Sequence, residues 1–175
     1  MTAGRKPFDM IVQSSTVELF QFYGVALAPS QVAVGKNRHH DIVGSVTFGG
    51  PNLSGVLGLS LPGEILAALA GEPSGAHALA DLTRELTNQL MGRIKNRLAR
   101  YGVALRAGLS SVADARMRKG PPGCSEILYV FRALRGEVLV TLTGDLERVT
   151  LVYKAAPSIP EAGEVILFGE AKGPR

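Results

Sequence analysis

A short stretch between residues 81 and 92 combines carboxylate, amide and glycine at a spacing that suits one face of a helix. The stripe, with steps of four, three and four positions, consists of Asp81, Glu85, Asn88 and Gly92. It contains no histidine or cysteine, so it offers no nucleophile–base pair. An amide, however, donates to one oxygen and accepts from another, which suits it to orienting a water molecule. The stripe therefore indicates chemistry in which a reactive group needs only a positioned water.

An apolar stripe on the opposite side of the same segment predicts the helix that carries these residues. Its members recur every three or four positions: Leu79, Leu82, Leu86, Leu90, Ile94, Leu98 and Tyr101. The pattern predicts one helix from about Ala76 to Tyr101, closed by Gly102. Because the apolar stripe must face a core, the polar stripe must face solvent.

The order Asp81-x3-Glu85-x2-Asn88, continued to Gly92, resembles the signature of the CheC/CheX/FliY phosphatases of bacterial chemotaxis, and CheX most closely. The resemblance covers residues 7–143. Besides the helix, it rests on Pro7-Phe8, Gly44–Phe48, Gly55–Leu61, Pro62-Gly63-Glu64 and Leu105–Val112. It implies an α+β fold, in which a mostly antiparallel sheet packs against two long helices and one short helix. We expect residues 1–175 to form one such domain, with residues 144–175 as an additional β-rich C-terminal extension.

The resemblance also implies a function for the polar stripe. It implies hydrolysis of the aspartyl phosphate on a CheY-type response-regulator receiver domain. Asn88 would orient the attacking water, Glu85 would pair with the receiver's lysine, and Asp81, Arg84 and Gly92 would contact the partner. The protein would need no metal or cofactor of its own, because the receiver supplies Mg²⁺. The resemblance also implies that the protein is a homodimer.

Three residues depart from the CheX-like pattern. Arg84 precedes the glutamate where a small residue is common, Arg93 follows Gly92, and Ser111 stands where proline is frequent. Arg84 lies beside the polar stripe, where it could obstruct a receiver or bind an acidic patch on it. A non-catalytic scaffold that binds a receiver or another signalling protein is therefore the alternative. The polar stripe by itself also fits an ordinary solvated helix face. Asp81 has a further interpretation, as an early-turn residue favoured by the helix dipole.

The rest of the chain predicts the elements around this helix. We expect helices at Phe8–Tyr23 and Ile65–Ala70, and extended segments at Val25–Val34, Asp41–Phe48, Gly55–Leu61, Ala104–Leu109, Ile127–Phe131, Glu137–Leu142, Arg148–Tyr153 and Glu164–Phe168. The strands before and after Arg135-Gly136 read as a hairpin. Glu18-x2-Gln21 in the first helix is the nearest echo of Glu85-x2-Asn88, but its amide is glutamine, and we do not interpret it as a second site.

Composition favours a small soluble domain. The chain has 175 residues, of which 46% are hydrophobic, enough for one good core. Its single cysteine, Cys124, excludes an intramolecular disulfide and fits a reducing compartment. We find no secretory segment and no membrane-spanning run, so we expect a cytoplasmic protein that does not insert into a membrane.

The net charge of +4 raises the question of nucleic acid, but the pattern of the charges argues against it. The basic residues near the end of the long helix complement its dipole, and those in Arg116–Pro122 suit an exposed loop. No aromatic residues interleave with them to stack on bases. His39-His40-Asp41 lacks the further ligands of a metal site, so we expect no metal.

Overall fold

The computed structural model describes residues 6–34, 40, 42–50, 53–71, 75–114, 125–145 and 151. Three helices and six strands follow one another along this part of the chain. The helices are α1 (Lys6–Phe22), α2 (Gly63–Ala70) and α3 (Ala76–Ala99). The strands are β1 (Ala28–Val34), β2 (Ile42–Gly49), β3 (Ser54–Ser60), β4 (Arg106–Asp114), β5 (Ser125–Ala133) and β6 (Gly136–Asp145).

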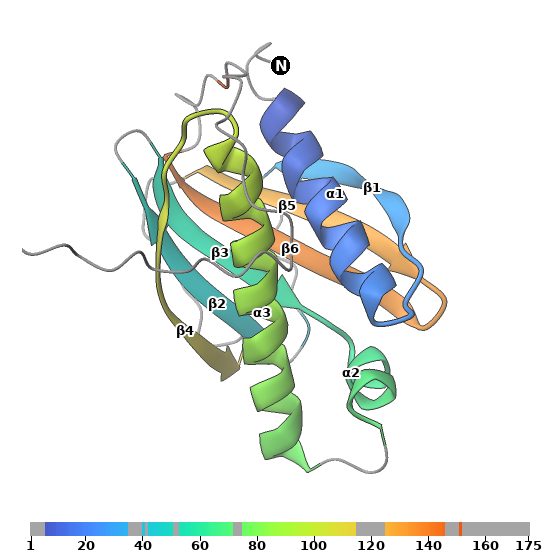
Figure 1. The fold of residues 1–175 in the computed structure, drawn as a ribbon. Helices are drawn as coiled ribbons and strands as arrows, with labels where there is room; N and C mark the ends of the chain where they lie inside the picture. Colours follow the sequence, from blue (N-terminus) through green and yellow to red (C-terminus); the bar gives the residue numbers. More distant parts are fainter. Residues whose placement is uncertain are drawn as a thin grey trace, which may run out of the picture.

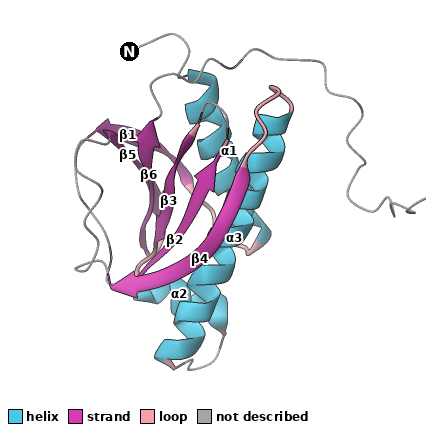
Figure 2. Cartoon of the chain, turned by 90° about the vertical axis from the view of Figure 1, so that its left-hand side faces the viewer, coloured by secondary structure: helices cyan, strands magenta, loops and turns pink. Residues whose placement is uncertain are grey.

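The strands form one six-stranded sheet in the order β1-β5-β6-β3-β2-β4, and every neighbouring pair is antiparallel. Figure 2 shows the sheet nearly edge-on, with α1 and α3 together on one of its faces. In Figure 1, α2 lies beyond the end of the sheet, next to the first turns of α3. The expected α+β class, with an antiparallel sheet and three helices, is confirmed.

The core lies between the sheet and the two longer helices. α1 contributes Phe8, Ile11, Val12, Leu19 and Phe20; α3 contributes Leu86, Leu90, Met91, Ile94 and Leu98; the sheet contributes Leu57, Leu59, Tyr129, Phe131, Val138, Val140 and Leu142. Leu79, Leu82 and Tyr101 pack against this cluster while partly exposed. The apolar stripe predicted for α3 is therefore confirmed, and its burial sets which side of α3 meets solvent.

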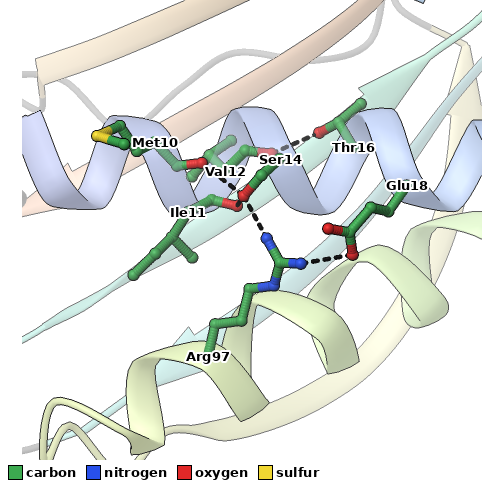
Figure 3. Close-up of polar contacts among 7 residues, drawn as sticks. All are labelled: Met10, Ile11, Val12, Ser14, Thr16, Glu18 and Arg97. Atoms are coloured by element: carbon green, nitrogen blue, oxygen red, sulfur yellow. Dashed lines mark hydrogen bonds and ion pairs between the residues drawn. The ribbon is translucent and has the colours of Figure 1, made fainter.

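α1 and α3 run antiparallel and are joined by polar contacts (Figure 3). An Arg97 guanidinium nitrogen lies 2.5 Å from Oε2 of Glu18, and the other terminal nitrogen donates a hydrogen bond to Oγ of Ser14. Glu18, whose spacing to Gln21 resembles that of Glu85 to Asn88, thus helps to hold the two helices together.

α3 ends as its glycine predicts. Gly102 has a φ of 73°, its N–H bonds to the carbonyl of Ala99, and the N–H of Val103 bonds to that of Leu98. These two bonds satisfy carbonyls that the helix end would otherwise leave unpaired.

Several predicted boundaries differ from the structure, and pairing between strands accounts for two of them. The strand expected to end at Leu109 continues to Asp114, because its backbone pairs with β2 as far as Ile42. The hairpin turn lies at Leu134-Arg135, because Gly136 already pairs with Ala133 as the first residue of β6. The predicted loop Arg116–Pro122 and strand Glu164–Phe168 lie outside the described residues, as does Arg148–Tyr153 except for Leu151. Within the described residues, no helix is long and apolar enough to cross a membrane.

Candidate functional site

The polar stripe of α3 lies on the solvent side of the helix. Asp81, Glu85 and Asn88 are exposed, and Gly92 is partly exposed. Leu86, Leu90 and Ile94 on the other side are buried against the sheet. The structure therefore brings the predicted site residues together on one open helix face.

Two buried threonines and a glycine fix this part of α3 against the sheet. The hydroxyls of Thr83 and Thr87 bond back to the carbonyls of Leu79 and Thr83, at 2.7 Å each, so both threonines are buried with their polar atoms satisfied. Beneath them, a Cβ placed on Gly44 would lie 2.1 Å from Oγ1 of Thr87. Only glycine lets the backbone of β2 approach this closely.

Glu85 is held by a second amide that the sequence did not single out. Nε2 of Gln89 donates a hydrogen bond of 2.8 Å to Oε1 of Glu85. Oε1 of Gln89 in turn accepts a hydrogen bond of 3.1 Å from the hydroxyl of Tyr23. One carboxylate oxygen of Glu85 is thus occupied, and no described residue bonds to the other.

Asn88 lies on the same face one turn after Arg84, with its side chain exposed. Within the described ranges, no hydrogen bond engages its amide. An exposed, unengaged amide can donate to one oxygen and accept from another in a partner.

Asp81 and Arg84 form an ion pair beside the site. Nη1 of Arg84 lies 2.5 Å from Oδ1 of Asp81, and Nε2 of His77 lies 3.5 Å from Oδ2. Arg84 thus points back toward the start of α3, as helical side chains tend to do, and away from Asn88 one turn ahead. The interpretation of Asp81 as an early-turn residue is wrong, because α3 begins at Ala76 and has no acidic residue in its first turn.

Gly92 and the two remaining departures from the CheX-like pattern, Arg93 and Ser111, have ordinary structural surroundings. Gly92 needs no special backbone geometry, and a Cβ there would meet nothing within 4 Å. Arg93 is partly buried on α3. Ser111 is inside β4, paired with Ser45 across the ladder, and their hydroxyls lie 3.0 Å apart.

The histidines form no shared site in the described part of the chain. Nε2 of His40 lies 2.8 Å from the carbonyl oxygen of Glu137, and its backbone N–H bonds to Oγ of Ser60. His77 is on α3, while His39, Asp41 and Cys124 lie outside the described residues. Across those described ranges, no group of three or more histidine, cysteine, aspartate or glutamate side chains is placed to bind a metal ion.

A pocket of about 380 Å³ opens where the turn after α1 meets α2 and the β5–β6 hairpin. Tyr23 and Val25 line it from the segment after α1, Ile65 and Leu69 from α2, and Leu134 from the hairpin. Tyr23 therefore lines this pocket, and its hydroxyl bonds to Gln89.

Comparison with known proteins identifies the fold. No family model and no curated protein matches the sequence. Among solved structures, a CheC-like superfamily protein from Shewanella sp. PV-4 superposes with a TM-score of 0.70 and 19% identity, covering 82% of this chain and 98% of that one. The chemotaxis protein CheX from Desulfovibrio desulfuricans gives a TM-score of 0.66 and 20% identity, over 82% and 100% of the two chains.

A third similar structure is a complex. It is the CheX–CheY–BeF₃–Mg²⁺ complex from Borrelia burgdorferi, with a TM-score of 0.61, 13% identity, and coverage of 82% of this chain and 98% of that one. The chain therefore has the fold of the CheC-like and CheX proteins, as the resemblance over residues 7–143 predicted.

Proposed function

We propose that this protein hydrolyses the aspartyl phosphate of a CheY-type receiver domain. The observation that carries the proposal is the Glu85/Asn88 pair, exposed on a helix whose opposite face is fixed to the sheet. The fold adds support, because a CheX of the same fold forms a complex with CheY, BeF₃ and Mg²⁺.

Asn88 is the group we assign to the chemical step. Its amide would accept from a water and orient it in line with the phosphorus–oxygen bond to the receiver's aspartate. The water oxygen bonds to phosphorus, the bond to the aspartyl oxygen breaks, and the products are inorganic phosphate and a free carboxylate. Well-oriented reactants gain at most about 7–11 kcal/mol from such positioning, so an amide with no acid–base ability of its own suffices.

Glu85 is the group we assign to docking. Its oxygen without a described partner would accept from the receiver's lysine, which sets the register of Asn88 against the phosphate. An ion pair at an exposed surface contributes about 0.2–1 kcal/mol, and more once an interface excludes water. The Mg²⁺ that neutralises phosphate charge would come with the receiver, so the chain needs no metal ligand set of its own.

Asp81, Arg84 and Gly92 would form the rim of the interface. Arg84 is partly exposed and its guanidinium already has a carboxylate partner, so it neutralises Asp81 beside the docking surface. Gly92 has no side chain, so no group projects from the helix surface one turn beyond Asn88.

We also propose that the protein is a homodimer in the cytoplasm. β1 and β4 are the edges of the sheet, and an edge strand has unpaired backbone groups along one side. β4 also exposes 94% of Leu109. Light scattering would give the mass, and a monomer at working concentration would contradict this part of the proposal.

The alternative is a receiver-binding scaffold without catalysis. The specific observation that favours it is the position of Arg84, whose long side chain begins one turn before Asn88 on the same helix face. A scaffold needs the docking role of Glu85 but not the chemical role of Asn88.

The test is a comparison of two asparagines on the same helix face. Asn96 is exposed on α3 two turns after Asn88, so Asn96→Ala is the matched control for Asn88→Ala. Purified CheY-type receivers are phosphorylated with acetyl phosphate, and phosphate release is followed with each protein. We expect the wild type and Asn96→Ala to speed release, and Asn88→Ala to leave only the receiver's intrinsic rate while binding persists. If the wild type binds the receiver without speeding phosphate release, the scaffold is established. If it neither binds the receiver nor speeds release, both the phosphatase and the scaffold proposals are overturned.

A further inference from the structure

We propose that Gln89 and Tyr23 are positioning residues for Glu85, and that they hold its carboxylate in the orientation that a receiver lysine meets. The inference rests on the docking role proposed for Glu85. It adds two residues, one of them from the turn after α1, to the two that the helix signature contains.

The geometry is a directed chain of two hydrogen bonds. The Tyr23 hydroxyl donates to Oε1 of Gln89 at 3.1 Å, and Nε2 of Gln89 donates to Oε1 of Glu85 at 2.8 Å. The reverse amide orientation would place a carbonyl oxygen against a carboxylate oxygen, and both are acceptors. The glutamate charge and the tyrosine proton therefore select the same orientation of the Gln89 amide.

Tyr23 is itself fixed by the end of α1. Gly24, with a φ of 76°, allows the N–H of Val25 to bond to the carbonyl of Phe20 at 2.9 Å. The Tyr23 ring meets the Phe22 ring edge-on, with centroids 5.3 Å apart. Tyr23 also lines the pocket between the end of α1, α2 and the β5–β6 hairpin. The hydroxyl that orients Gln89 thus belongs to a side chain placed by elements outside α3.

The other end of the helix pair prevents α1 from sliding along α3. Arg97 bonds to Ser14 and Glu18 two turns after Gln89, as Figure 3 shows for the Arg97 end. With one contact at Tyr23 and another at Arg97, the register between the helices is set at both ends. Glu85 therefore receives its orientation from the α1–α3 packing and not only from its own backbone.

Holding the carboxylate before docking reduces the rotamer freedom lost when the lysine binds. Loss of a hydrogen bond to a charged group typically changes an equilibrium about 10-fold or more, and a neutral one about 2- to 10-fold. We therefore expect Gln89→Leu to weaken receiver binding roughly 10-fold and Tyr23→Phe roughly 3-fold. The chemical step at saturating receiver should change less than about 3-fold, because Asn88 is untouched.

The experiment measures binding and chemistry separately. Binding uses a purified CheY-type receiver activated with BeF₃⁻ and Mg²⁺, and chemistry uses the same receiver phosphorylated with acetyl phosphate. Tyr23→Phe keeps the ring and the pocket wall, so it tests the hydroxyl alone. Asn96→Leu is the control for placing leucine on the same exposed helix face. In a Glu85→Gln background, Gln89→Leu should weaken binding by much less than in the wild type, because the two residues act through one contact.

A measurement without the receiver separates failure of this inference from failure of the proposed function. Heteronuclear NMR follows the Gln89 side-chain amide in the free protein. We expect Tyr23→Phe and Glu85→Gln each to shift that resonance, and Asn96→Leu not to. Unchanged Gln89 amide signals in the first two variants would overturn the positioning role even if the protein is a phosphatase. Equal loss of binding and of saturated rate in Gln89→Leu would overturn it as well, because that result indicates general distortion.

Discussion

Gly44 of β2 and Thr87 of α3 are in such close contact that a Cβ on the glycine would lie 2.1 Å from the threonine Oγ1. Thr87 is buried, and Asn88 follows it directly on the exposed side of the helix. The distance between the sheet and the candidate site is therefore set by the absence of one methyl group.

Gly44→Ala should displace α3 from the sheet. The added carbon would also lie 3.0 Å from the backbone oxygen of Thr83, so the helix backbone itself must move. Overpacking of this kind costs about 1–3 kcal/mol, which urea unfolding would measure. Receiver binding and phosphate release should fall together, because Glu85 and Asn88 move as one.

Gly49→Ala is the matched control, since Gly49 lies on the same strand and its Cβ would meet nothing within 4 Å. It should leave binding and phosphate release unchanged. If Gly44→Ala and Gly49→Ala have the same free energy of unfolding, receiver binding and phosphate release, the contact with Thr87 does not position the site.

The sequence predicts α3 well because burial on a helix repeats every 3.6 residues. The stripe from Leu79 to Tyr101 locates the helix, and its polar complement locates Glu85 and Asn88. Gly102 predicts the end of α3 because its positive φ suits a helix C-terminus.

The sequence does not predict the contacts that orient the site, because these contacts join residues far apart in the chain. Tyr23 and Gln89 are 66 positions apart, and Glu18 and Arg97 are 79 apart. No local pattern pairs such residues. For the same reason no local pattern predicts the end of β4: pairing with β2 extends the strand past Leu109 to Asp114.

Ser15→Ala should stabilise the protein. Ser15 is buried in α1, and its hydroxyl has no hydrogen-bond partner in the described part of the structure. An unpartnered buried hydroxyl costs roughly 1–3 kcal/mol, and alanine also favours the helix. We expect a gain of about 1 kcal/mol in the free energy of unfolding.

The neighbouring serine provides the control for that gain. The Ser14 hydroxyl donates to the carbonyl of Met10 and accepts from Arg97 (Figure 3). Ser14→Ala should therefore lower the free energy of unfolding by about 0.5–1.5 kcal/mol. Equal effects of the two substitutions would show that helix propensity alone is responsible.

Gly92→Ala should separate stability from docking. A glycine within a helix costs about 0.5–1 kcal/mol relative to alanine, and the new Cβ has open space, so the protein should become more stable by that amount. If a receiver packs against this surface, the same methyl group should weaken binding of the BeF₃⁻-activated receiver. Gly63→Ala, a glycine of α2 with equally open surroundings, is the control and should leave binding unchanged. Unaltered binding in Gly92→Ala would remove Gly92 from the interface.

Asp81→Ala should lower phosphate release by freeing Arg84. The ion pair holds the Arg84 guanidinium 2.5 Å from Oδ1 of Asp81, on the side away from Asn88. Without that carboxylate, the arginine can extend along the helix face toward the site. An exposed ion pair contributes about 0.2–1 kcal/mol, so it favours the Arg84 orientation toward Asp81 by about 1.5- to 5-fold. The loss of phosphate-release rate in Asp81→Ala should be of the same size.

The double variant Asp81→Ala/Arg84→Ala decides what Arg84 does. If the arginine only obstructs the site once released, removing it restores the wild-type rate of phosphate release, and Arg84→Ala alone is at least as active as the wild type. A loss of receiver binding in Arg84→Ala would instead show that the guanidinium contacts the partner. In that case Asp81 and Arg84 bind the receiver as a pair, and the double variant should bind no better than either single one.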